Sequence, residues 1–187
     1  MRNWYVITGG PSAGKTTLIE ALEKAGYHVE HESARLVIDE ALVDGKTVED
    51  IRADEQKFQD TVFQHKLDRE RRLNPDELIF FDRGMQDTDA YHTLHGFPIS
   101  SEQVNAMNQA EYQQVFLLEP FSFEEDYART ESAHEAERLF DLLKEAYQKS
   151  QTPLTIIPCF PTKEERIEYF FNLLLEYGVI QNTPEHS

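Results

Sequence analysis

Gly9-Gly10-Pro11-Ser12-Ala13-Gly14-Lys15-Thr16-Thr17 matches the pattern G-x-x-x-x-G-K-[ST] in full. An apolar, β-rich run at residues 4–8 precedes this stretch, and apolar residues with helical spacing follow it. Strand, glycine-rich loop and helix, in that order, are the context that the pattern requires. The stretch therefore predicts a phosphate-binding loop, around which the rest of the chain is organised.

The residue types of the loop suit this role. Glycines let the backbone curl so that N–H groups point at a phosphate chain, and the helix start adds unpaired N–H groups. Lys15 can reach the β- and γ-phosphates, and the Thr16 hydroxyl can ligate Mg²⁺. The alternative, a chance glycine turn beside a surface lysine, is disfavoured by the full match. The residues expected to contact a nucleotide are Gly10, Ser12, Ala13, Gly14, Lys15, Thr16 and Thr17.

The composition limits the class of protein. The chain has 187 residues, of which 40% are hydrophobic, enough for one globular domain with a core. The 18 Lys and Arg residues and 35 Asp and Glu residues give a net charge of −17. Because such a polyanion repels nucleic acid and anionic membranes, we expect neither as a partner.

The sequence predicts neither a signal peptide nor a membrane span. The first predicted strand begins almost at Met1, which leaves no room for a signal peptide, and no apolar run approaches the roughly 20 residues of a membrane span. The single cysteine, Cys159, excludes an intrachain disulfide and a cysteine metal cluster. We therefore expect a cytoplasmic protein, with one domain over residues 1–180 and a flexible tail over residues 181–187.

Apolar runs alternate with helical periodicity along the chain. A long helix is expected after the capping box at Thr47–Asp50, as far as Asn74, and Ser33 is expected to cap an earlier helix. The alternation predicts an α/β fold with a five-stranded parallel sheet, covered on both faces and binding ligands at the carboxyl ends of its strands. The expected strands are residues 4–8, 27–30, 78–82, 115–118 and 154–157.

Asp82 and Arg83 follow the third predicted strand. A carboxylate at the end of a strand after the phosphate loop commonly holds Mg²⁺, directly or through water, and the alternative for Asp82 is a helix cap. Large ring-forming ATPases usually have Glu at the next position. Aspartate followed by arginine instead resembles small nucleoside and nucleotide kinases, in which the arginine stabilises phosphoryl charge or holds the acceptor. The alternative for Arg83 is a surface ion pair with one of the many carboxylates.

Glu32, Arg35 and Arg129 are further candidates. Glu32 follows the second strand, where a carboxylate can take the proton of an acceptor hydroxyl, although Glu32 can equally be a helix-start residue. Asp82 is the alternative residue for orienting or deprotonating the acceptor. Arg35, one helical turn on, is a candidate acceptor ligand together with Glu32 and Arg83. Arg129 lies in a polar stretch predicted as a lid over residues 121–135, from which an arginine can reach the transferring phosphate. Its alternative role is that of a solvated helix-start residue.

Other residues have weaker signals. Phe58, with Gln59 and Gln64, could bind an acceptor base, although core packing is the default for Phe58. His92 and His95 have a metal-compatible spacing, but no third ligand follows at a suitable distance, so we interpret them as helix-surface residues. The loop at residues 158–162, after the last strand, is positioned to hold an adenine base.

In this order, these residues resemble the AAA-type P-loop ATPase family related to the ribosylnicotinamide kinase domain, a nucleoside-kinase-like group. The resemblance covers nearly the whole chain and implies ATP binding, Mg²⁺ and a nucleoside-kinase-like fold. Many members of the family are only predicted ATPases with no assigned substrate. The matching segments are residues 7–17, 32–35, 58–59, 81–84, 115–118, Arg129 and 164–166.

The residues are compatible with more than one function. The leading hypothesis is an ATP-dependent kinase that phosphorylates a hydroxyl of a small-molecule acceptor. The second is an ATPase or nucleotide switch that acts through a protein partner. A ring ATPase is disfavoured by the short chain and the Asp-Arg pair, and the absence of an Asn-Lys-x-Asp motif disfavours a GTP switch. A homodimer is compatible with the sequence, which does not determine the oligomeric state.

Overall fold

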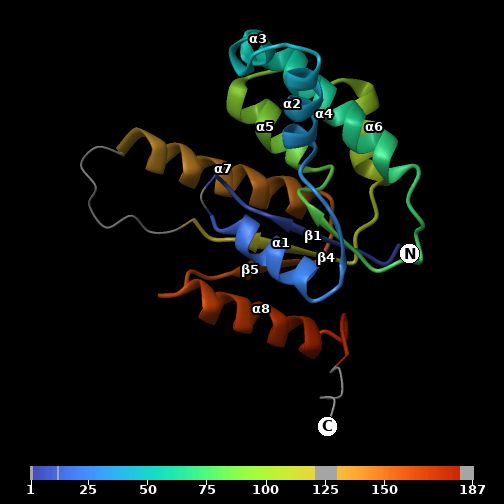
Figure 1. Ribbon diagram of the computed structural model, residues 1–187, viewed down its shortest axis with the longest axis vertical. Coiled ribbons are helices and arrows are strands. Elements are labelled where there is room, and N and C mark those ends of the chain that lie inside the picture. Colours follow the sequence, from blue (N-terminus) through green and yellow to red (C-terminus); the bar gives the residue numbers. More distant parts are fainter. Residues whose placement is uncertain (1, 12, 121–129, 182–187) are drawn as a thin grey trace.

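The computed structural model describes residues 2–11, 13–120 and 130–181, with only the backbone described at 130–133 (Figure 1). Its strands form one five-stranded parallel sheet in the order β2-β3-β1-β4-β5, which confirms the predicted fold class. The strands are β1 (Trp4–Thr8), β2 (His28–Glu30), β3 (Ile79–Asp82), β4 (Gln114–Leu118) and β5 (Leu154–Ile157).

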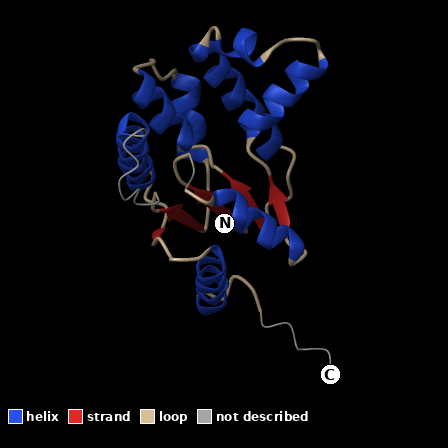
Figure 2. Cartoon of the chain, turned by 60° about the vertical axis from the view of Figure 1, so that its left-hand side comes forward, coloured by secondary structure: helices blue, strands red, loops and turns tan. Residues whose placement is uncertain are grey.

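Helices cover both faces of this sheet (Figure 2). In the part of the chain that the structure describes, no helix is long and apolar enough to cross a bilayer. The helices are α1 (Lys15–Lys24), α2 (Ser33–Val43), α3 (Val48–Arg52), α4 (Glu55–Glu70), α5 (Asp87–His95), α6 (Ser101–Gln109), α7 (Thr130–Lys149) and α8 (Lys163–Glu176).

The core follows the two-residue period of β1. Ile7 packs with residues of α1 and α8, including Leu18 and Phe170. Its neighbour Val6 points to the other face and packs with Phe63 of α4 and Tyr147 of α7. Alternate side chains of the central strand thus enter different cores, as expected for a strand buried on both faces.

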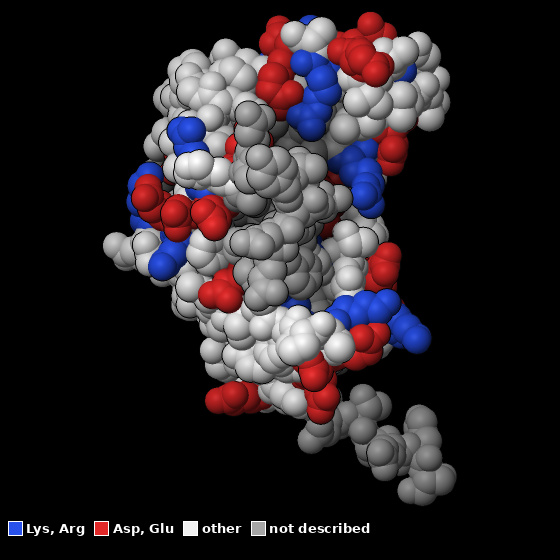
Figure 3. Space-filling model, turned by 90° about the vertical axis from the view of Figure 1, so that its left-hand side faces the viewer, with Lys and Arg blue, Asp and Glu red and all other residues white. Residues whose placement is uncertain are grey.

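Helices α2 to α5 pack together at one end of the molecule (Figure 1). They follow β2 and β3, so this helical cluster overhangs the carboxyl ends of those strands. On the face presented in Figure 3, acidic and basic side chains are interspersed, and no continuous basic patch is seen there.

Three local predictions were wrong. The expected long helix is divided into α3 and α4, because Asp54 leaves the helical conformation (φ −120°, ψ 85°) and accepts a hydrogen bond from the Lys57 backbone N–H at 3.0 Å. Glu32, and not Ser33, occupies the N-cap position of α2. His92 is fully buried, with Nδ1 3.0 Å from the Pro98 carbonyl oxygen, so it is not a helix-surface residue.

Phe116 offers a test of this core. It is fully buried in β4 and meets the Phe170 ring edge-to-face, with ring centroids 5.1 Å apart. Phe116→Ala is expected to lower the free energy of unfolding by about 3–5 kcal/mol, measured by urea denaturation. Leu42→Ala, at a site 44% exposed, is the control and should change it by less than about 0.5 kcal/mol. Equal effects of the two substitutions would contradict the assignment of Phe116 to the core.

Candidate functional site

The predicted phosphate loop curls at the carboxyl end of β1. The Gly10 carbonyl oxygen accepts hydrogen bonds from the Ala13 N–H at 3.3 Å and from Lys15 Nζ at 3.4 Å. Gly14, the N-cap of α1, has φ +82°, a left-handed conformation that glycine adopts without steric cost. Thr16 is exposed in the first turn of α1, where helical N–H groups lack intrahelical partners. Ser12 lies outside the described residues.

Lys15 is buried beside this loop. Burial and, to a smaller extent, the nearby Arg83 lower the pKa of its ammonium to about 8, while Asp82, Glu32 and Asp87 partly oppose the shift. The protein therefore holds a desolvated cation whose charge is incompletely balanced. Such a group is suited to bind an anion.

Asp82 ends β3 near Lys15. Burial raises the pKa of its carboxyl group, against the opposing effects of Lys15 and Arg83. Its Oδ1 atom is buried and has no hydrogen-bond partner among the described residues. An unpartnered carboxylate oxygen and the exposed hydroxyl of Thr16 are oxygen donors of the kind that Mg²⁺ prefers. No cluster of three or more His, Cys, Asp or Glu that could hold a metal occurs among the described residues, so Mg²⁺ would depend on phosphate oxygens for further ligands.

Arg83 and Glu32 meet, although they are 51 positions apart. Arg83 Nε donates to Glu32 Oε1 at 2.7 Å, and Nη1 donates to the Gly9 carbonyl oxygen at 3.1 Å and to Asp87 Oδ1 at 3.3 Å. Burial alone would raise the pKa of Glu32, but Arg83, Lys15 and Lys66 outweigh it, and the pKa is lowered. Glu32 is thus ionised at neutral pH. Arg83 does form an ion pair, but its guanidinium is buried and only Glu32 is partly exposed, so the pair is not a surface one.

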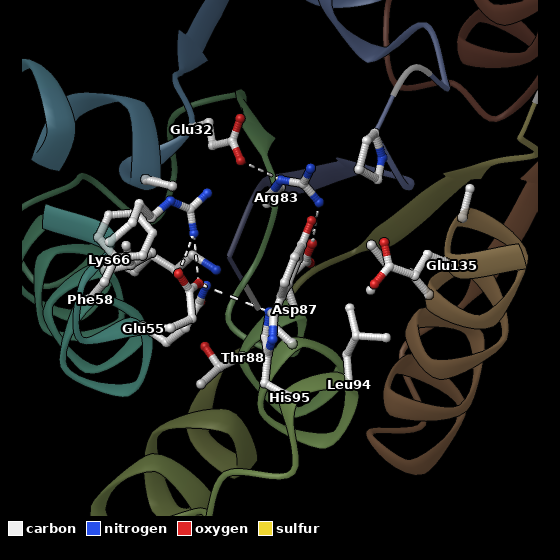
Figure 4. Close-up of a pocket in the computed structure, with 18 residues that line it drawn as sticks. Glu32, Glu55, Phe58, Lys66, Arg83, Asp87, Thr88, Leu94, His95 and Glu135 are labelled. Carbon is white, nitrogen blue, oxygen red and sulfur yellow. Dashed lines mark hydrogen bonds and ion pairs between the residues drawn. The ribbon is translucent and has the colours of Figure 1, made fainter. Parts of the chain in front are cut away.

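A cavity of about 650 Å³ opens beside this pair (Figure 4). Pro11 of the phosphate loop and the polar cluster of Glu32, Arg83 and Asp87 lie at one part of its wall. Apolar side chains from α2, α4, α5 and α7 form much of the remainder. They are Ala34, Phe58, Val62, Leu94, Ala136 and Leu139.

A second polar group lies elsewhere in the cavity wall. Arg52 Nη1 donates to both carboxylate oxygens of Glu55, at 2.6 and 2.8 Å, and Gln59 Nε2 donates to Glu55 Oε1 at 2.8 Å. His95 Nε2 is 3.9 Å from Glu55 Oε1. Phe58 is 3% exposed, so it belongs to the core as well as to the cavity wall.

Two residues of the site were missed by sequence reasoning. Asp87 is fully buried, and Thr8, Tyr147 and the Gly84 N–H donate to it at 2.7, 2.5 and 3.1 Å. Lys66 is buried and donates from Nζ to the Gly84 carbonyl oxygen at 3.0 Å. The spacing i, i+4 from Arg83 to Asp87 was an available signal, and Lys66 follows Phe58 and Val62 at four-residue spacing on the buried face of α4.

Arg166 of α8 links the phosphate loop to the sheet. Nη1 donates to the Ala13 carbonyl oxygen at 2.6 Å, while Nη2 donates to the Glu119 and Ile157 carbonyl oxygens at 3.1 and 3.2 Å. These contacts join the loop to the ends of β4 and β5. Beside them, a cavity of about 440 Å³ reaches Cys159 in the loop predicted to hold adenine.

Some predicted residues are not brought to the cavity. Arg35 is exposed on α2 and is not among the residues of the wall, and Gln64 is exposed and donates to Glu102 at 3.3 Å. The acceptor role of Arg35 stays a prediction. Arg129 and residues 121–128 of the predicted lid lie outside the described residues. Residues 130–135 begin α7, and Glu135 lies in the cavity wall.

Known proteins were compared with this chain. No curated protein matches it. Among solved structures, the NadR protein in complex with NR has a TM-score of 0.68 and 16% identity, covering 98% of this chain and 52% of that chain. A thymidylate kinase from Ehrlichia chaffeensis has a TM-score of 0.64 and 12% identity, covering 91% and 97%. A deoxyadenosine kinase from M. mycoides has a TM-score of 0.60 and 16% identity, covering 93% and 99%.

At these identities, the likeness to the solved structures concerns the fold. The family comparison goes further, because a model described as "AAA domain" matches residues 4–166. That match spans most of the chain and contains the phosphate loop, Glu32, Asp82 and Arg83. The protein therefore belongs to the AAA domain family, in the P-loop fold that it shares with NadR and the two kinases.

Proposed function

We propose that the protein transfers the γ-phosphoryl group of ATP to a hydroxyl of a small, nucleoside-like acceptor. The observation that carries this proposal is the partly buried Glu32–Arg83 pair, which lines the same 650 Å³ cavity as Pro11 of the phosphate loop. A carboxylate and a phosphate-binding loop thus share one cavity large enough for a small molecule. The fold of NadR in complex with NR and of a deoxyadenosine kinase supports a nucleoside-like acceptor.

Each residue has a role suited to its surroundings. The N–H groups of the phosphate loop and Lys15 bind the phosphates, while Thr16 and Asp82 hold Mg²⁺. When bound, Mg²⁺ neutralises charge on the phosphate oxygens. Arg83 stabilises charge on the transferring group, and the Glu32 carboxylate orients the acceptor hydroxyl and accepts its proton. Arg129 is a further candidate for contact with the transferring phosphate.

The charges of the cavity wall favour an acceptor without a phosphate of its own. The described cations are already engaged: Arg52 with Glu55, Lys66 with the Gly84 carbonyl, and Arg83 with Glu32. A phosphorylated acceptor would have to displace one of these contacts and approach the wall's carboxylates. The carboxylates are Glu32, Glu55, Asp87 and Glu135.

The second candidate is an ATPase or nucleotide switch that acts through a protein partner. It would use the same phosphate loop, Lys15 and Asp82. Only a kinase requires a second substrate site beside Glu32. The cavity that Glu32 lines therefore favours the kinase over the switch. Acceptor-dependent turnover separates the two.

An acceptor panel tests the transfer reaction. ADP formation from MgATP is measured with nucleosides, their 5′-monophosphates and small hydroxyl metabolites, and we expect an unphosphorylated compound to accelerate it. Glu32→Gln should leave MgATP affinity within about twofold and lower acceptor-dependent kcat by about 10²–10⁴-fold. Lys15→Ala should lower affinity and turnover together.

Glu55→Gln is the matched control, because Glu55 lies in the same cavity wall but pairs with Arg52. It should change the KM of the acceptor more than kcat. Full activity of Glu32→Gln would exclude Glu32 as the proton acceptor. Acceleration by 5′-monophosphates alone would contradict the proposed acceptor class.

The pH dependence of nucleotide binding tests Lys15. Because its pKa is about 8 in the free protein, the ammonium that phosphates bind is lost as the pH rises above 8. MgATP affinity, measured by calorimetry, should then fall by up to about tenfold per pH unit. Lys15→Arg keeps its charge and should remove this dependence between pH 7 and 9.5, whatever its affinity. An unchanged decline in Lys15→Arg would assign the titration to another group.

Neutralising Asp82 and neutralising Asp87 should change the free energy of unfolding in opposite directions. The folded state raises the pKa of Asp82, so its stabilising protonated form is lost as the pH rises. Burial alone would raise the pKa of Asp87, but Lys66 and Arg83 outweigh it and lower the pKa, so its stabilising ionised form is present at neutral pH. At pH 7 without ligands, Asp82→Asn should raise the free energy of unfolding by about 0.5–2 kcal/mol. Asp87→Asn should destabilise by about 3 kcal/mol.

Urea denaturation measures both effects. Stabilisation by Asp82→Asn, combined with loss of Mg²⁺-dependent ATP turnover, would show that the carboxylate is kept for function at a cost in stability. Destabilisation by both substitutions would contradict the view that Asp82 Oδ1 has no hydrogen-bond partner, as found among the described residues.

A further inference from the structure

The turn after β3 has an unusual backbone at Arg83. Its φ is +73°, a left-handed conformation that is unfavourable for a residue with a side chain. The Arg83 side chain also donates hydrogen bonds to Glu32, to the Gly9 carbonyl oxygen and to Asp87. Strained backbone at a functional site persists only where the surroundings hold it.

The next peptide groups show what holds it. The Gly84 N–H donates to Asp87 Oδ2 at 3.1 Å and to the Tyr147 hydroxyl at 3.2 Å, and the Gly84 carbonyl oxygen accepts from Lys66. The Met85 N–H donates to the Tyr112 hydroxyl at 2.9 Å. Both peptide groups that follow Arg83 are therefore bound by buried side chains, which come from α4, α5, α7 and the residues before β4.

Tyr147 connects two parts of this arrangement. Its fully buried hydroxyl accepts from the Gly84 N–H and donates to Asp87 Oδ2 at 2.5 Å. The other oxygen of Asp87 accepts from Arg83 Nη1. Burial raises the pKa of Tyr147 well above its ordinary value, so the hydroxyl keeps the proton that it donates. Tyr147 thus holds the backbone beside Arg83 and the carboxylate that binds its guanidinium.

The space around Gly84 fits this role. A Cβ atom at this position would lie 2.7 Å from the Tyr147 hydroxyl oxygen and 2.9 Å from Val6 Cγ2. Only glycine therefore lets the hydroxyl approach the turn this closely. We propose that Tyr147 is a positioning residue that fixes the Arg83 guanidinium at the phosphate side of the cavity, through Gly84 and Asp87. This inference rests on the proposed function for the role of Arg83.

A double-mutant cycle tests the proposal. Tyr147→Phe removes only the hydroxyl, and we expect it to lower the kcat for ADP formation about five- to tenfold, the loss of one hydrogen bond, with the KM for ATP within about twofold. In an Arg83→Lys background, the same substitution should lower kcat by less than about twofold, because the group that it positions is absent. Tyr177→Phe is the control, because it also removes one tyrosine hydroxyl, which lies at the end of α8 and contacts Thr155 of β5 at 3.1 Å; it should leave kcat unchanged.

A second readout does not depend on turnover. In ¹⁵N-labelled protein, solvent exchange of the Arg83 Nε–H, which is bonded to Glu32, is followed by NMR and should become about five- to tenfold faster in Tyr147→Phe but not in Tyr177→Phe. Unchanged exchange, unchanged kcat, or an equal kcat loss in both backgrounds would overturn the proposal. Absence of any ADP formation by the unmodified protein would refute the proposed function instead, and the exchange measurement would still decide whether Tyr147 positions Arg83.

Discussion

The Arg83 guanidinium carries a full positive charge into the protein interior, and the surrounding chain balances it. A buried cation is tolerated only when it is paired and hydrogen-bonded. Its acceptors follow different strands: Gly9 comes after β1, Glu32 after β2 and Asp87 after β3. One side chain therefore fixes the carboxyl ends of three adjacent strands relative to one another. The cavity exists where these ends meet the helices that follow them.

The free site is electrostatically incomplete in two complementary ways. Lys15 and Arg83 are close enough for Arg83 to lower the pKa of Lys15, and Asp82 keeps a buried oxygen without a partner among the described residues. A phosphate chain with a bound cation would place negative charge beside Lys15 and Arg83 and positive charge beside Asp82. Together with the left-handed backbone of Arg83, these features cost stability in the free protein. The proposed function gives these features a physical rationale.

Much of this arrangement could be predicted from the sequence because it depends on local patterns. The glycine loop, the five strands and the carboxylate at the end of β3 have short-range signals, and parallel topology brings strand ends together. The contacts of Lys66 and the contact between Asp87 and Tyr147 could not be predicted, because they depend on how α4 and α7 pack over one turn. His92 was misjudged for the same reason. Its neighbours on α5 are polar, but Pro98 and Gln103 from later in the chain bury it.

The unpredicted break at Asp54 shapes the part of the cavity wall that contains Arg52, Glu55 and Phe58. In a continuous helix, residues six apart point to different sides. Here the Arg52 guanidinium lies over the Phe58 ring, 4.4 Å from its centroid, because α3 ends and α4 begins between them. The break also leaves Arg52 free to bind Glu55, which Gln59 binds from the next turn. The phosphate side of the site is thus built from a motif recognisable in the sequence, whereas the opposite wall depends on one aspartate cap.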